Sequence, residues 1–217
     1  MLRNNKEKLQ KIFSKIYYKN GFKGKDSISG PGSDLEQTKT IRDEIPRLID
    51  RLNIKKLLDI PCGDFYWMKL VELNDTKYIG GDIVSEIIDY DNKNYGKPNV
   101  KFSKINLLED KLPDAELLLC RDCLVHLSYH DILKALQNIK KSSVEYLLTT
   151  TFPDRIENLD IRTGQWRPLN LNIAPFNFPE ALFMLNEKCT ENNSIYSDKS
   201  LGLWKIDDLP DLNLIIE

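Results

Sequence analysis

The chain has 217 residues, of which 41% are hydrophobic, and its 31 basic and 33 acidic side chains give a formal net charge of −2. This length and composition predict a single folded domain over residues 1–217 rather than a disordered chain. The near-neutral charge argues against nucleic acid as a partner. No apolar stretch reaches the roughly 18 residues that a membrane helix needs, which argues against a membrane partner.

The start of the chain, MLRNNKEKLQ, lacks the apolar core of a signal peptide. We therefore expect a cytoplasmic protein, in which Cys62, Cys120, Cys123 and Cys189 are reduced thiols. The sequence carries no signal for a particular oligomeric state.

Apolar residues at helical spacing predict a first helix over residues 2–19, and a loop rich in Gly, Ser and Asp follows it. Ser33 and Glu36 have the spacing of a capping box. They predict a second helix that starts at Ser33 and is broken or kinked by Pro46 before it ends at Leu52. We expect residues 1–33 to form an N-terminal helix and loop ahead of the main α/β unit.

From residue 55 onward, short apolar segments alternate with amphipathic ones. The predicted strands are 55–60, 77–82, 99–105, 115–120 and 144–152, and the predicted helices are 65–73, 84–90 and 128–141. Strands that alternate with helices of this length form a parallel sheet covered on both faces. Residues 181–191 and 199–209 predict two further strands, which would pair antiparallel at the edge of the sheet.

The stretch LLDIPCGDFYWM, residues 57–68, has the outline of a strand running into a nucleotide-binding turn. A pyrophosphate-binding turn needs several glycines so that its backbone amides can approach the phosphates, but only Gly63 is present here. A cofactor without phosphates, such as S-adenosylmethionine (AdoMet), has less need of that cradle. It requires a carboxylate near its ammonium group, an acid for its ribose diol and an apolar slot for adenine. Asp59 closes the first strand and Asp82 the second, at about the 20-residue separation expected for a ribose-binding acid.

Together with SGPGS, YIGGDIV, LLCRDCLVHLS, LLTTTF and TGQWRPLNL, this stretch resembles the class I AdoMet-dependent methyltransferases over residues 30–152. The motifs are most similar to those of a little-characterised bacterial and viral group of these enzymes. The resemblance implies a Rossmann-like α/β fold, with a seven-stranded, mostly parallel sheet, helices on both faces and an antiparallel final strand. It also implies that AdoMet lies over the first two strands. The sequence departs from the general motif where Pro61 and Phe65 replace glycines and Asn106 replaces an acid.

On this basis we expect residues at the strand ends, and one in the loop before the second helix, to bind the cofactor. They are Ser33, Asp59, Pro61, Cys62, Gly63, Asp82, Ile83, Asn106, Leu107 and Arg121. Plainer alternatives exist for the acids: Asp59 could cap the helix that follows it, and Asp82 could be a solvated turn carboxylate.

His126 and Asp122 follow the fourth strand and are the candidates for the catalytic group that takes a proton from the acceptor. Histidine titrates near neutrality and accepts hydroxyl protons well; the alternative for His126 is a place in the core or at the start of a helix. Cys120, Cys123 and His126 have the zinc-like spacing C-x-x-C-x-x-H, but no second paired motif accompanies them. We therefore expect buried thiols and no metal.

Residues 153–180 are rich in Asn and Pro and have no period, which is typical of a functional loop or lid. We expect this insertion to bind the acceptor through Arg155, Trp166, Arg167 and Asn170, with the indole stacking on a ring and Arg binding an anion. The alternative is a loop fixed by one buried Trp.

The sequence thus predicts AdoMet-dependent methylation of a small-molecule acceptor. We expect oxygen, or else nitrogen, as the target and a sugar or phosphorylated glycan precursor as the acceptor. The competing interpretations are a non-catalytic protein that binds AdoMet or a nucleotide, and a zinc-dependent interaction module.

Overall fold

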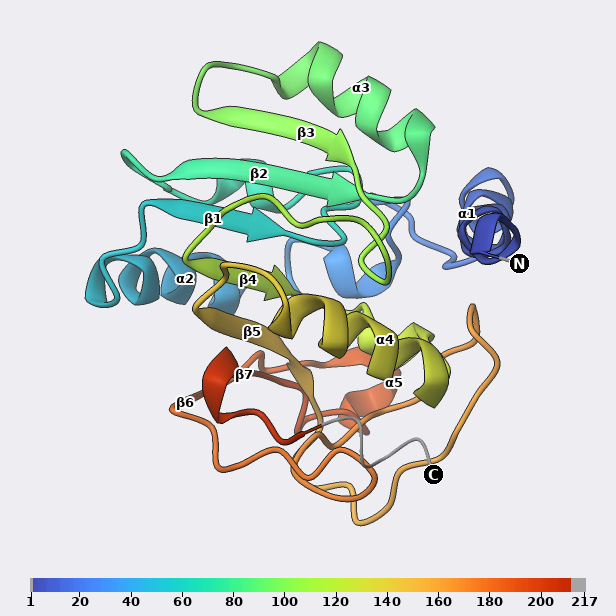
Figure 1. The fold of residues 1–217 in the computed structure, drawn as a ribbon. Helices are drawn as coiled ribbons and strands as arrows, with labels where there is room; N and C mark the ends of the chain where they lie inside the picture. The colour runs from blue at the N-terminus through green and yellow to red at the C-terminus, as the bar shows by residue number, and fades with distance from the viewer. Residues whose placement is uncertain (1, 212–217) are drawn as a thin grey trace.

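The computed structural model describes residues 2–211, and a seven-stranded sheet runs through the middle of the molecule (Figure 1). The strand order is β3-β2-β1-β4-β5-β7-β6. The strands are β1 (Lys56–Asp59), β2 (Lys77–Asp82), β3 (Val100–Lys104), β4 (Leu117–Cys120), β5 (Tyr146–Thr151), β6 (Phe183–Asn186) and β7 (Ser200–Lys205). The first five are parallel, whereas β7 pairs antiparallel with both β5 and β6. This confirms the predicted Rossmann-like sheet and its antiparallel final pair.

The helices are α1 (Leu2–Tyr18), α2 (Lys39–Arg51), α3 (Ser85–Tyr95), α4 (Tyr129–Lys140) and the short α5 (Glu191–Ser194). Of these, α2 and α3 pack in one core cluster and α4 in the other, so both faces of the sheet are covered. Successive strand residues point to opposite faces, so Leu57 packs in the core cluster that contains α2 and Leu58 in the one that contains α4. Because both faces are covered, β4 is apolar throughout, as a buried parallel strand must be.

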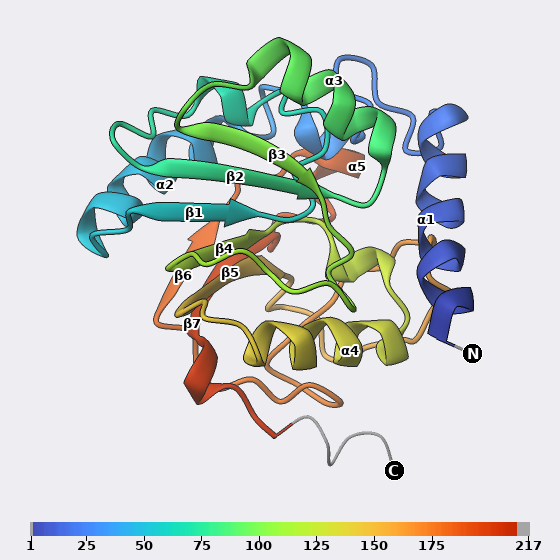
Figure 2. The ribbon, with the colours of Figure 1, turned by 45° about the horizontal axis from the view of Figure 1, so that its top comes forward.

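Helix α1 does not cover a face of the sheet. It stands beyond the carboxyl ends of β1, β2 and β3, across the edge where these strands stop (Figures 1 and 2). Gly164 of the insertion packs closely on it, since a Cβ there would meet Ile12 Cγ2 at 2.7 Å. Sequence periodicity predicted this helix but not its location. No helix in the described part of the chain is long and apolar enough to cross a membrane.

Two helix predictions were wrong near the first strand. The helix expected from Ser33 begins at Lys39 instead, and Ser33 ends a short 3₁₀ turn, Pro31–Ser33, whose Gly32 carbonyl accepts a hydrogen bond from Arg121. Pro46 lies inside α2, which continues without a break to Arg51.

The helix expected over residues 65–73 is only a 3₁₀ turn, Met68–Leu70. Phe65 has a φ of 54°, which a helix cannot contain, and its ring packs 4.9 Å from that of Tyr78 and 5.0 Å from that of Phe102. Tertiary packing of the aromatic side chain therefore overrides the local helical pattern.

Candidate functional site

A deep cavity, the first cavity, opens beyond the carboxyl ends of β1, β2 and β4, which is where ligands bind in open α/β sheets. It encloses about 1140 Å³ with its open mouth included. Its lining residues are Leu9, Phe13, Tyr17, Phe22, Ile28, Ser29, Ser33, 59–64, Trp67, 82–84, Ile87, Ile105, Leu107, Leu108, 121–123, His126 and Leu127.

Two buried carboxylates face this cavity from neighbouring strand ends. Asp59 accepts a hydrogen bond of 2.6 Å from the Tyr78 hydroxyl, yet burial raises its pKa to about 7. Asp82 accepts one of 2.9 Å from the Val84 amide, and burial raises its pKa to about 6. For both acids, the free-energy cost of burying the charge therefore exceeds what their present partners offset.

The turn that follows β1 packs against the loop of residues 27–33. Asp64 ties the two together, because its carboxylate accepts hydrogen bonds from the Ser27 hydroxyl at 2.9 Å and the Ile28 amide at 3.1 Å. Gly63 has a φ of 56°, and a Cβ there would lie 2.2 Å from Ser29 Oγ. A glycine is therefore required at this position both for the turn and for the loop that covers it.

Nine of the ten residues expected to bind the cofactor line the first cavity: Ser33, Asp59, Pro61, Cys62, Gly63, Asp82, Ile83, Leu107 and Arg121. The exception is Asn106. Its side-chain oxygen accepts a hydrogen bond from the Leu108 amide, so the amide group shapes the turn after β3 instead of facing the cavity. The adjacent Leu107 and Leu108 supply an apolar wall in its place.

Several cavity residues were not foreseen. Leu9, Phe13 and Tyr17 of α1 form one wall, and Trp67 another. The apolar face of α1 was visible in the sequence, but an amphipathic pattern does not say what the face will pack against.

A second cavity adjoins the first and shares Phe22, Ser29, Asp122 and His126 with it. Its remaining walls are Gly21, 30–32, Phe152, Trp166, Glu191, Asn192, Tyr196 and Lys199. Trp166, the one member that the sequence assigned to an acceptor site, is 39% exposed and packs edge to face on Phe152 and Tyr196.

His126 lies where the two cavities meet. Its Nδ1 is 3.0 Å from the carbonyl oxygen of Gln165, which can only accept, so Nδ1 carries the hydrogen and Nε2 is left with a lone pair. Burial lowers the pKa of His126, which keeps the ring neutral near pH 7. The geometry suits it to accept a proton.

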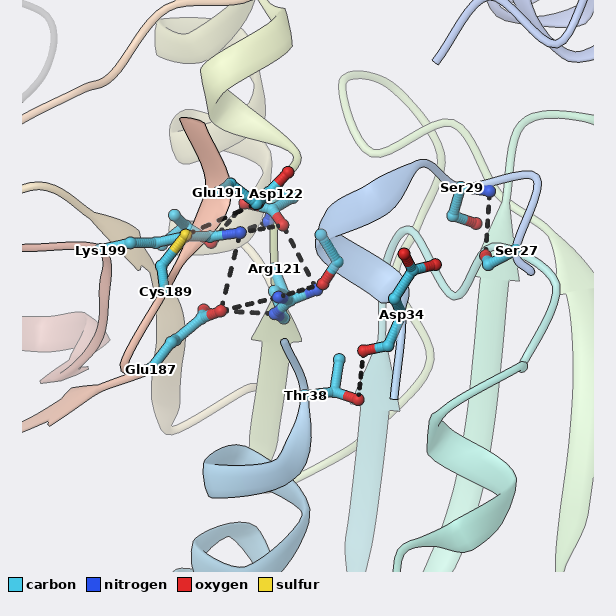
Figure 3. Close-up of polar contacts among 12 residues, drawn as sticks. Ser27, Ser29, Asp34, Thr38, Arg121, Asp122, Glu187, Cys189, Glu191 and Lys199 are labelled. Carbon is cyan, nitrogen blue, oxygen red and sulfur yellow. Dashed lines mark hydrogen bonds and ion pairs between the residues drawn. The ribbon is translucent and has the colours of Figure 1, made fainter. Parts of the chain in front are cut away.

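Asp122 belongs to a buried ionic cluster that also contains Arg121, Glu187 and Lys199 (Figure 3). Lys199 Nζ lies 2.6 Å from Asp122 Oδ2, and Arg121 Nη2 lies 2.7 Å from Glu187 Oε2. Burial alone would raise the pKa of Asp122, but Lys199 and Arg121 hold it well below its ordinary value. Asp122 is thus a poor proton acceptor, and of the two catalytic candidates the electrostatics favour His126.

Three of the four residues expected to bind the acceptor line neither cavity. Arg155 forms an ion pair with Asp198 at 2.8 Å. Arg167 is buried and donates to the carbonyl oxygens of Leu124 and Leu127 at 2.8 and 2.9 Å. Asn170 donates to the carbonyls of Pro153 and Arg155. These side chains fix the insertion to the body of the protein, which leaves Trp166 as the candidate acceptor contact.

Among residues 2–211, no three His, Cys, Asp or Glu side chains gather as a metal site would require. Cys120 is fully buried in the core cluster around α4, and Cys123 packs against that cluster. The Nδ1 of His126 faces Gln165 rather than either thiol.

No protein-family model and no curated protein matches the sequence. Among solved structures, human N-acetylserotonin methyltransferase in complex with SAM (AdoMet) is similar with a TM-score of 0.57 and 13% identity, over 77% of this chain and 52% of that one. The chain thus spans about half the length of that enzyme. The N-methyltransferase NodS from Bradyrhizobium japonicum WM9 is similar with a TM-score of 0.56 and 13% identity, over 82% of this chain and 99% of that one. The fold is therefore that of the class I AdoMet-dependent methyltransferases.

Proposed function

We propose that the protein is an AdoMet-dependent methyltransferase that methylates an oxygen of a small molecule. The observation that carries the proposal is the meeting of two cavities at His126, a neutral histidine with a free Nε2 lone pair. One cavity has the residues that AdoMet requires, and the other has room for an acceptor.

The residues of the first cavity fit AdoMet on chemical grounds. Asp82 would accept from the ribose diol, and Asp59 would face the ammonium group of the methionine part. Ile83, Leu107 and Leu108 supply apolar surface for adenine. The raised pKa values of both acids support this fit, because the ammonium group and the ribose hydroxyls would add a cation and hydrogen-bond donors beside carboxylates whose charged form burial disfavours.

When bound, AdoMet supplies an electrophilic methyl group on a sulfonium, and the protein must align the acceptor with it and remove one proton. His126 would take that proton at Nε2, while the Gln165 carbonyl fixes the ring and stabilises the added charge. The walls of the second cavity would align the acceptor. Alignment would contribute more to the rate than proton removal does, because direct displacement depends on an in-line approach.

Transfer of a labelled methyl group from AdoMet tests the proposal. Purified protein and methyl-labelled AdoMet are incubated with a small-molecule cell extract, and labelled products are counted. We expect a labelled small molecule with the wild type and with His130→Ala, which changes an exposed histidine of α4. We expect little with His126→Ala. A protein that binds AdoMet but labels nothing would support the non-catalytic interpretation instead.

A further inference from the structure

We infer that the second cavity takes an uncharged acceptor with neighbouring hydroxyl groups, such as a sugar, and selects against phosphorylated or otherwise anionic molecules. This inference rests on the proposed methyltransferase function. It names the chemical class of the acceptor and the side chains that recognise it.

The charges around the second cavity disfavour an anion. The ionic cluster beside it pairs two cations, Arg121 and Lys199, with two carboxylates, Asp122 and Glu187 (Figure 3). Glu191, which lines the cavity together with Asp122 and Lys199, adds a third carboxylate. Burial alone would lower the pKa of Lys199, but Asp122 and Glu187 raise it above its ordinary value, so its ammonium stays charged and already paired. A phosphate would have to displace these carboxylates or lie beside them, and both cost free energy in a partly buried site.

The arginines that could have bound a phosphate are engaged elsewhere. Arg155 is paired with Asp198, and Arg167 with backbone carbonyls. Arg121 is held by Glu187 and by the Gly32 carbonyl. Within the described residues, Lys199 is the one cation that lines the second cavity.

The Asp122–Lys199 pair instead matches two adjacent hydroxyl groups. Asp122 Oδ1 has one long contact, 3.4 Å from the Thr150 hydroxyl, and can accept further hydrogen bonds. Lys199 contacts Asp122 and Glu187 at 2.6 and 3.6 Å, and an ammonium has three hydrogens. One hydroxyl of a diol would donate to Asp122 while its neighbour accepts from Lys199.

The aromatic part of the cavity wall suits the apolar face of a sugar ring. Trp166, Phe152 and Tyr196 pack edge to face with ring centroids 4.9 to 6.1 Å apart, so the indole is fixed in place although part of it is exposed. A rigid aromatic surface can cover the C–H face of a pyranose at little cost in side-chain entropy. The cavity thus combines aromatic surface with a pair of opposite charges.

The test compares neutral sugars with their phosphates. A panel of methyl hexosides and the matching hexose 6-phosphates is titrated into the protein saturated with S-adenosylhomocysteine, and methyl transfer from AdoMet is assayed in parallel. We expect at least one hexoside to bind and to be methylated. Its phosphate should bind at least about tenfold more weakly, since it adds charge beside three carboxylates.

The variant Glu191→Lys sharpens the comparison, because Glu191 lines only the second cavity and lies outside the most buried part of the cluster. The change gives the cluster an excess of cations, so it should narrow or reverse the preference for the neutral sugar. Glu191→Gln should act in the same direction by a smaller factor.

Phosphates that bind as well as the hexosides, or a panel in which no neutral member binds, would overturn the inference. A preference that is unchanged in Glu191→Lys would also overturn it, because the charge cluster would then not be its cause. If the methyltransferase proposal itself were wrong, the result would be distinguishable, because S-adenosylhomocysteine would not bind to the protein.

Discussion

The Nδ1 atom of His126 lies 3.0 Å from the carbonyl oxygen of Gln165, a residue 39 positions later in the chain. The contact joins the turn after β4 to the insertion, and it fixes which imidazole nitrogen carries the hydrogen. Two backbone bonds reinforce it, from the Gly164 amide to the His126 carbonyl and from the Arg167 amide to the Val125 carbonyl. The proposed proton acceptor is therefore positioned by the same segment that supplies Trp166 to the second cavity.

Replacing His126 should impair catalysis and not cofactor binding. His126→Gln should lower kcat about 10²- to 10⁴-fold, the usual contribution of general base catalysis. The AdoMet affinity should change by less than about 1 kcal/mol, because the side chain acts on the acceptor. Steady-state kinetics and calorimetry check this, with His130→Gln as the matched control. A kcat within about twofold of wild type would exclude His126 as the base.

The pH profile of kcat should report the same group. Burial lowers the pKa of His126, and the base is active when neutral, so kcat should rise with pH through a value below histidine's ordinary 6.5 and stay flat above it. The free energy of unfolding should also rise with pH in this range. The unfolded state binds a proton at His126 more readily than the folded state does, so the stability that the neutral ring contributes is lost as the pH falls. A kcat that falls as the pH rises through this range would contradict the assignment.

AdoMet affinity should increase with pH through the region of about 6 to 7. Both Asp59 and Asp82 have raised pKa values, about 7 and about 6, and each must lose its proton to accept from the cofactor. Binding should therefore release protons, which calorimetry detects as a dependence of the heat on the buffer. Without ligand, the stability contributed by these acids falls as the pH rises towards 7, because the folded state holds protons that the unfolded state has lost. Asp59→Asn, which can still accept from Tyr78, should release fewer protons; equal release in both proteins would contradict the assignment of Asp59.

Substitutions at Arg167 and Trp166 should have different effects, the first mainly on folding stability and the second mainly on acceptor binding. Arg167→Ala leaves buried carbonyls without donors and should destabilise the protein by about 3 kcal/mol, with a clear fall in Tm. Trp166→Ala should lower Tm less, because the indole is partly exposed and, within residues 2–211, bonds to no buried backbone group, and it should weaken acceptor binding. Similar falls in Tm for both variants would instead make the whole insertion structural.

The sheet could be predicted from sequence because each strand is marked by its own apolar run and the helices between them by their period. The lining of the first cavity could largely be predicted because most of the residues concerned stand at strand ends, which parallel topology brings to one edge. Arg167 could not be assigned correctly, since a basic residue in a loop has the same appearance whether it binds a ligand or the backbone. Lys199 was missed for a related reason: its partners, Asp122 and Glu187, are 77 and 12 residues away in the sequence.

The absence of a metal remains a prediction. Cys120 and Cys123 have zinc-like spacing, but we expect their thiols to pack in the hydrophobic core without binding a metal. Elemental analysis of the purified protein should therefore find no stoichiometric zinc. One zinc per chain that disappears in Cys120→Ser would contradict it.

The central claim is that AdoMet binds against Asp82 at the end of β2. Its most direct measurement is calorimetric titration of S-adenosylhomocysteine into the wild type, Asp82→Ala and Asp89→Ala, the last changing an exposed aspartate of α3. We expect saturable binding to the wild type and to Asp89→Ala. Asp82→Ala should bind at least about tenfold more weakly, a loss of about 1.4 kcal/mol or more, because the ribose loses a buried charged acceptor. Equal affinity in Asp82→Ala, or no binding to the wild type, would contradict the account.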